Sequence, residues 1–221
     1  YFADIPYLGN EVPFYLCRMT RKIWLAGQVV YIVCATAIYT VAILLSTILI
    51  CGQRCYVGNI WSETAVKLAF TSAGKKLSLA ASEKTLELTR PYACMTTIFF
   101  LLFAYALVMV LLIFWFRILW NELAGMIAGV VFNGISFIFS PGILQKLLGI
   151  SERKSYLANV AAGWISPLSH ATYHLHNFGY DRLPSLRDSG IYGMVLVIVL
   201  ILLNLYSIRT YHFVFGGTGE R

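Results

Sequence analysis

The chain alternates between long uncharged stretches and polar segments, and four of the uncharged stretches match the thickness of a bilayer. They cover residues 23–50, 91–116, 123–140 and 191–207. A membrane-crossing helix needs about 20 predominantly apolar residues, and its backbone amides must be satisfied within the segment because lipid offers them no partner. The pattern therefore predicts an all-α fold, a polytopic membrane helical bundle with four spans in this chain.

The segments between these stretches are polar enough to lie outside the hydrocarbon. Residues 1–22 are amphipathic, and residues 51–90 form a polar loop in which 61–70 has the pattern of a short interfacial helix. Residues 141–188 form the longest polar segment. Within it, 161–172 is apolar but too short to span, so we expect it to lie in the interface or to re-enter the membrane.

Composition strengthens the membrane interpretation. The chain is 59% hydrophobic and only 12% charged, about half the usual share of roughly 25% charged residues in soluble domains. Its net charge of +7 suits anionic lipid headgroups. The basic residues form no clustered soluble face, so we expect membrane lipid and no nucleic acid as a partner, and a multi-pass location in the cell membrane.

The third stretch contains a small-residue motif, GMIAG, with Gly125 and Gly129 four residues apart. Small residues at this spacing allow two helices to approach closely in lipid. These glycines are candidate helix-packing positions.

Three histidines, His170, His174 and His176, stand close together in SHATYHLH. His170 and His174 are four apart and would share a helical face, a spacing that can hold a metal. However, no glutamate follows His170 as in HExxH, and the remaining histidine, His212, lies beyond the last stretch. We therefore expect interfacial histidines with no metal or cofactor. An intramembrane metal-dependent enzyme using the three histidines stays as an alternative.

Other catalytic patterns are missing from the sequence. It has no Walker A motif, no GxSxG, and no CxxC among its cysteines at 17, 34, 51, 55 and 94. Ser166 and Ser169 are near His170 in sequence, but a nucleophile needs a base positioned in space. No catalytic residue is assigned, and any ATP hydrolysis is expected in another chain.

Several features together resemble the permease subunits of bacterial ABC-2-type ABC transporters. The run VPFYLCRMTRKIWLAGQ at 12–28 precedes a long uncharged helix, as a coupling helix does in that family. WISPLSHA at 164–171 is similar to the segment before the last family helix, and YHFVFGGTGER at 211–221 fits a short cytoplasmic tail.

The resemblance implies a non-catalytic permease subunit that works by alternating access. Its partners would be an ABC ATPase subunit and a second permease copy or homologue, and two family helices would precede this chain. Residues 1–22 would be the cytoplasmic coupling segment and 23–221 the transmembrane domain. The residues expected to couple to the ATPase are Pro6, Tyr7, Pro13, Phe14, Tyr15, Arg18 and Arg21.

The resemblance also implies that both ends of the chain face the cytoplasm, with 51–90 and 141–188 outside. Counting of basic residues opposes this orientation, because only six of the seventeen lie on the terminal side and basic residues favour the cytoplasm. The dense group of Arg18, Arg21 and Lys22 beside the first stretch favours it. A membrane scaffold without transport is a further alternative.

Overall fold

The structure is a computed structural model that describes residues 18–52, 57–71, 83–139, 141–147, 149, 151, 154–179 and 181–211. All regular secondary structure in these residues is helical, which confirms the all-α prediction. The elements are α2 (Arg21–Cys51), α3 (Glu63–Phe70), α5 (Glu83–Leu88), α6 (Pro91–Leu119), α7 (Glu122–Ile138), α8 (Pro141–Leu147), α9 (Ser155–Ile165), α10 (Pro167–Ala171), the 3-10 helix η3 (Tyr173–Leu175) and α11 (Leu186–Ser207).

Three helices are long and apolar enough to cross a membrane. They are α2 with 31 residues, α6 with 29 and α11 with 22, and they contain the first, second and fourth predicted stretches. Most of their surface is covered by no other part of the described chain, and large apolar side chains such as Leu49 and Phe100 are exposed. In water this surface would be costly, so lipid or another protein must cover it.

The third predicted stretch, 123–140, is not one continuous helix. α7 ends at Ile138 and α8 begins at Pro141, and the axes of the two helices differ by 73°. Proline supplies no backbone N–H and restricts the residue before it, so a helix rarely continues through it, whereas it fits the first helical position well. The described chain thus has three candidate spans, or four if α7 and α8 form one broken span.

The last helix begins five residues before the predicted start at 191. Ser185 caps it in a capping box, in which the Ser185 hydroxyl accepts from the Asp188 amide at 3.2 Å and the Asp188 carboxylate accepts from the Ser185 amide at 3.0 Å. Such a box satisfies two backbone N–H groups that would otherwise lack a helical partner. The extra turn brings Ser189 onto the helix.

The hydrophobic core lies around α6, which contacts α2, α7, α10 and α11. Its fully buried residues include Leu111 and Phe114 from α6, and Leu25 and Ile32 from α2. α11 contributes Leu200 to the same cluster. Because α6 has neighbours on several sides, it organises the packing of the other long helices.

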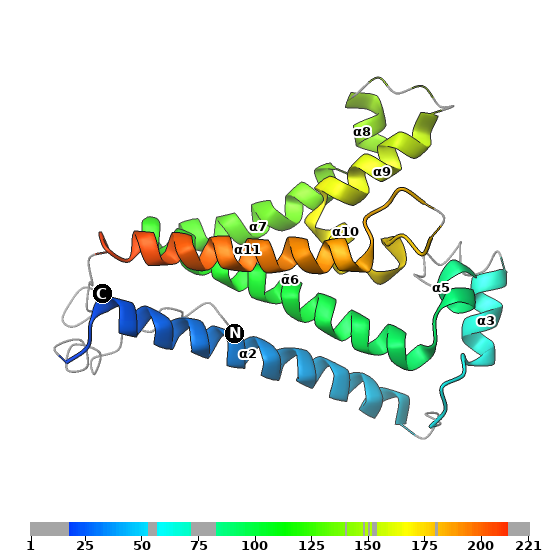
Figure 1. Ribbon diagram of the computed structural model, residues 1–221, viewed down its shortest axis with the longest axis horizontal. Helices are drawn as coiled ribbons and strands as arrows, with labels where there is room; N and C mark the ends of the chain where they lie inside the picture. The colour runs from blue at the N-terminus through cyan, green and yellow to red at the C-terminus, as the bar shows by residue number, and fades with distance from the viewer. Residues whose placement is uncertain are drawn as a thin grey trace, which may run out of the picture.

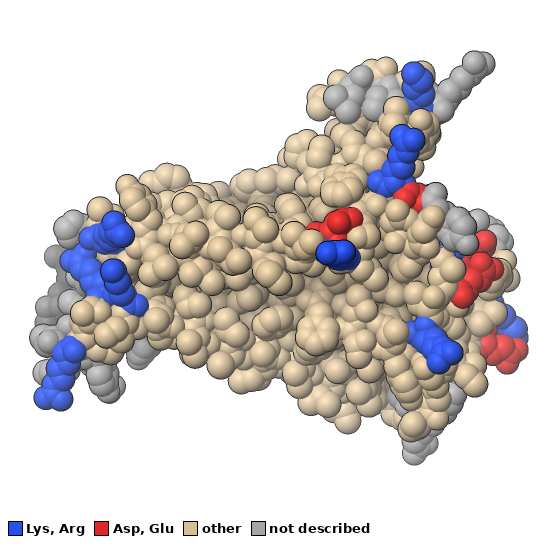
Figure 2. Space-filling model, viewed as in Figure 1, with Lys and Arg blue, Asp and Glu red and all other residues tan. Residues whose placement is uncertain are grey.

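The long helices α2, α6 and α11 run side by side (Figure 1). At one end, the first residue of α2 meets the chain after α11, because Arg21 Nη1 donates to the Arg209 carbonyl at 2.7 Å. Figure 2 shows only cationic side chains at this end of the visible face, and both signs at the other end. We call the first the basic end and the second the loop end.

Two short helices, α3 and α5, occupy the loop end. The expected interfacial helix at 61–70 corresponds to α3, which begins after Ser62, whose hydroxyl accepts from the Ala65 amide at 3.2 Å. Trp61 Nε1 donates to the Thr89 carbonyl at 2.8 Å. This bond ties the start of α3 to the chain just before α6.

The glycines of the GMIAG motif lie where α7 packs against α6, and both are buried. A Cβ on Gly125 would lie 2.8 Å from the Ile113 carbonyl oxygen, and closer still to the Arg117 side chain. A Cβ on Gly129 would lie 3.0 Å from the Ile113 side chain. The two helices could not approach so closely with larger residues here.

Replacing Gly125 with alanine is therefore expected to destabilise the protein by about 1–3 kcal/mol, since overpacking forces the two helices apart. Gly134→Ala is the matched control on the same helix, because nothing lies within 4 Å of its added methyl. Thermal unfolding in detergent, followed by size-exclusion chromatography, measures both. Equal melting temperatures for the two variants would contradict this packing.

Candidate functional site

The residues expected to couple to an ATPase fall into two groups. Pro6, Tyr7, Pro13, Phe14 and Tyr15 lie outside the described residues. Arg18 is exposed just before α2, and Arg21 is the first residue of that helix. Arg21 bonds to the carbonyl of Arg209, so the entry to α2 is linked to the end of α11.

The basic end also carries the turn between α6 and α7. Arg117 forms an ion pair with Glu122 at 2.7 Å across this turn, and Asn121 caps α7 by accepting from the Ala124 amide at 2.8 Å. Trp115 Nε1 donates to the Ser207 hydroxyl at 3.0 Å, joining α6 to α11. Polar contacts thus connect three helix ends at the side where the coupling segment would enter.

A second polar site lies at the loop end, where α9, α10 and η3 lead into α11. α9 ends at Ile165, and Pro167 starts α10 as its first residue, a position that proline favours. α10 ends at Ala171, since Thr172 has extended backbone before η3 begins. These two breaks fold the chain back over α10 and bring His170 and His176 to the same residue of α11.

That residue is Ser189, and both imidazoles contact its hydroxyl. His170 Nδ1 and His176 Nε2 each lie 2.8 Å from Ser189 Oγ. The other nitrogen of each ring meets backbone carbonyls: His170 Nε2 lies 3.1 Å from Trp164 O, and His176 Nδ1 lies 2.9 Å from Thr172 O. We call His170, His176 and Ser189 the His–Ser–His cluster.

The cluster is almost completely buried. The exposed fractions are 6% for His170, 1% for His176 and 4% for Ser189. Burial lowers the pKa of both histidines from their ordinary value of 6.5, although hydrogen bonds to backbone carbonyls oppose this. The Tyr192 ring stacks on His170 with ring centroids 4.2 Å apart, which fixes the plane of the imidazole.

The predicted group of three histidines is not brought together as one site. His170 and His174 do not share a helical face because α10 ends between them. His174 instead lines a separate cavity with Trp61 and Cys94. Within the described part of the chain, no three His, Cys, Asp or Glu side chains are arranged to hold a metal.

Sequence reasoning missed Ser189 and considered Ser166 and Ser169 instead. Ser166 and Ser169 line a cavity beside α9 and α10. The signal for Ser189 was the spacing of Ser185 and Asp188, which is typical of a capped helix start. A helix predicted to begin after Ser185 would carry Ser189 and Tyr192 on one face, about one turn apart.

Two larger cavities adjoin this region. One, of about 800 Å³, lies among α7, α9, α10 and the chain before α11, with Arg182 and the ion-paired Lys84 and Asp181 among its lining residues. The other, of about 430 Å³, is mostly apolar and lies between α6 and α11. His170 and Ser189 form part of its wall, so the cluster borders a cavity despite its burial.

Two buried polar atoms in the spans have no hydrogen-bond partner within the described residues. They are Asn204 Oδ1 in α11 and Thr36 Oγ1 in α2. The Asn204 amide donates to Leu200 O at 2.8 Å, and its weaker contact with Leu111 O at 3.4 Å reaches α6. Polar groups inside spans are expensive and often mark function, but neither atom adjoins the His–Ser–His cluster in the contacts described here.

Comparisons with known proteins identify no relative. No family profile matches the chain, and neither a curated protein nor a solved structure is significantly similar to it.

Because only two of the three histidines belong to the cluster, substituting one inside it and one outside it should affect stability differently. His176→Gln is expected to lose about 1–3 kcal/mol, since it removes buried hydrogen bonds and leaves their partners unsatisfied. His174→Gln, which lies outside the cluster, is the control and should change the melting temperature much less. Thermal unfolding in detergent measures both. A metal site shared by all three histidines would instead make the two substitutions equally damaging.

Proposed function

We propose that the chain is a membrane-spanning permease subunit of an ABC-2-type ABC transporter, located in the cell membrane. The resemblance at 12–28 and 164–171 suggests this function. ATP hydrolysis belongs to a separate ATPase subunit, and a second permease copy or homologue completes the transport pathway. The apolar helices favour an amphipathic, lipid-like or peptide cargo over a small ion.

The structural observation that carries the proposal is the contact between Arg21 and the Arg209 carbonyl. The contact joins Arg21, at the end of the proposed coupling segment, to the chain just beyond the last span. A push on residues 1–22 would therefore act on α2 and α11 together. Both helices pack on α6, so the movement could spread through the bundle as a rigid-body rearrangement.

The short helices before α11 also fit the proposal. In the family that the chain resembles, a segment like WISPLSHA precedes the last helix. Here that segment forms the end of α9 and the whole of α10, and it contacts α6, α7 and α11 at the loop end. Its position between the spans suits a segment that would respond to their movement.

A metal-dependent enzyme receives less support from the geometry. His174 lines a different cavity from the other two histidines, and the nitrogens of these two that do not meet backbone carbonyls both contact Ser189 Oγ. A scaffold without transport differs from the proposal in one measurable property, since it needs no ATPase.

The coupling role predicts the effect of charge in the docking segment. Phe14→Asp and Tyr15→Asp should leave the protein folded and inserted while an ATPase subunit no longer co-purifies and substrate-stimulated ATP hydrolysis is lost. A charge at a small apolar interface core is strongly unfavourable because its water is removed. Phe14→Leu is the matched control and should retain binding.

Size-exclusion profiles and membrane fractionation check that the variants fold and insert. Unchanged ATPase binding and coupling in both aspartate variants would place the docking site elsewhere and count against the permease assignment.

The proposed orientation predicts which side of the membrane each end faces. In a cysteine-free background, Ser151→Cys and Glu63→Cys at the loop end should react with an impermeant maleimide on intact cells. Arg18→Cys at the basic end should react only after the membrane is opened. Labelling of Arg18→Cys on intact cells would reverse the topology.

A further inference from the structure

We propose that His170 and His176 form a binding site for a single proton, which they share through the hydroxyl of Ser189. The inference concerns the chemistry of the cluster and does not depend on the transported cargo or on an ATPase. It follows from counting hydrogens on the three side chains.

The first step is the tautomer of His170. Its Nε2 faces the Trp164 carbonyl at 3.1 Å, and a carbonyl oxygen can only accept. Nε2 therefore carries the hydrogen in the neutral ring. Nδ1 is left with its lone pair directed at Ser189 Oγ, 2.8 Å away.

The second step is the tautomer of His176, which is the opposite one. Its Nδ1 faces two carbonyls, Thr172 O at 2.9 Å and Tyr173 O at 3.1 Å, so Nδ1 carries the hydrogen. Nε2 then presents its lone pair to Ser189 Oγ, also at 2.8 Å. Both imidazoles thus turn an acceptor toward the same hydroxyl.

A serine hydroxyl has only one hydrogen to donate. When both rings are neutral, one of the two short contacts is a hydrogen bond and the other brings two lone pairs together. One added proton corrects this mismatch, because the imidazolium N–H donates to Ser189 Oγ while the hydroxyl donates to the other ring. The added bond is charge-assisted and so stronger than a neutral one.

A second proton has no place in this arrangement. With both rings charged, each would direct an N–H at Ser189 Oγ, and the hydroxyl hydrogen would lose its acceptor. The two positive charges would also repel each other in a buried site. The capacity of the cluster is therefore one proton for two histidines.

The positive charge can move between the two rings while the cluster keeps the same number of protons. When His170 Nδ1 gives its proton to Ser189 Oγ, the original hydroxyl hydrogen passes to His176 Nε2. The positive charge then lies on His176, and the hydroxyl is restored with its donor direction reversed. The two arrangements have the same number of hydrogen bonds.

Some neighbouring groups favour a positive charge on the two rings and others oppose it. Asp188, one residue from Ser189 on α11, favours charge on His170, whereas His174 disfavours charge on His176. Burial lowers the pKa of both rings, and their mutual repulsion makes the second proton the harder one to add. The Tyr192 ring that covers His170 adds no charge at neutral pH.

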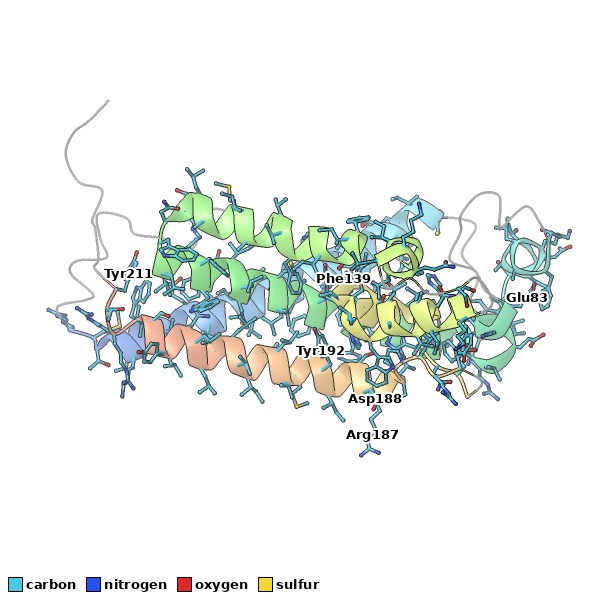
Figure 3. All side chains as sticks on the ribbon, turned by 90° about the horizontal axis from the view of Figure 1, so that it is seen from above. Glu83, Phe139, Arg187, Asp188, Tyr192 and Tyr211 are labelled. Carbon is cyan, nitrogen blue, oxygen red and sulfur yellow. The ribbon has the colours of Figure 1, made fainter. Side chains whose placement is uncertain are left out.

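The remaining neighbours contribute little charge. Arg187 points away from the bundle (Figure 3). α7 has one ionisable residue, Glu122, at its opposite end. α9 and the loop-end part of α6 contain no Asp, Glu, Lys, Arg or His.

Protonation would tighten the link between α10 and the last span. His170 and His176 come from the chain before α11, whereas Ser189 belongs to α11 itself. On going from the neutral to the singly protonated state, the second of the two contacts becomes a hydrogen bond. Loss of the proton leaves one contact unsatisfied, which weakens the link between this part of the chain and the helix.

The test is an NMR titration of the protein in detergent, with ¹⁵N-labelled histidine and chelator present. At a pH well above the ordinary histidine value of about 6.5, His170 should show the Nε2–H tautomer and His176 the Nδ1–H tautomer. On acidification, both rings should respond with one common midpoint and together take up one proton. The second proton should bind only as the fold is lost.

Ser189→Ala keeps the size of the site but removes the bridge, and it should give the two rings separate midpoints. His174→Gln is the control: the two rings should still share one midpoint, which moves to higher pH because the repulsion from His174 is removed. If Ser189→Ala does not fold, the wild-type titration still decides the matter. Independent midpoints in the wild type, the same tautomer for both rings, or uptake of two protons by the folded protein would overturn the proposal.

Discussion

A polar group that is removed from water must find its partner inside the protein, and this constraint governs the whole structure. In lipid it makes every long apolar segment a helix. At the helix ends it is met by side chains, as where Ser185 and Asp188 cap α11. In the buried turn before α11 it fixes both imidazole tautomers, because the carbonyls of Trp164 and Thr172 need donors.

The sequence predicted the parts of the fold that depend on long, uniform patterns. Residues 23–50 and 91–116 are so apolar that α2 and α6 were recognisable without knowledge of their neighbours. The bend after α7 was harder to foresee. Pro141 indicated that a helix ends there, but the direction taken by α8 depends on its packing against α9.

The candidate sites were predictable to a smaller degree. The glycines at 125 and 129 carried a local signal, because close helix packing needs small residues at that spacing. The contact of the two histidines with Ser189 carried no local signal, since Ser189 lies 19 residues from His170 and meets it only because the helix breaks on both sides of α10. The sequence pointed to His170 and His174, four residues apart, whereas the structure brings together His170 and His176.

The last span connects the two sites. Ser189 is near its loop end and Ser207 closes it at the basic end, a separation of about 27 Å at 1.5 Å per residue. At the basic end, Ser207 accepts from Trp115 and the chain just beyond it accepts from Arg21. A rigid helix held at both ends would transmit a displacement at one site to the other, which is how a protonation event at the loop end would bear on coupling.

The central position of α6 has a consequence for how the chain is built during synthesis. α2 and α6 emerge before α7 and α11, and they can pair as soon as the segment between them has left the ribosome. α7 then packs on an α6 that is already in place, with its glycines against Ile113. α11 is made after α7, and the surface of α6 that receives it, including Leu111 and Trp115, stays open to lipid until then. An insertion intermediate without α11 would expose that surface and leave His170 and His176 without Ser189, so the insertion of α11 completes the packing around α6.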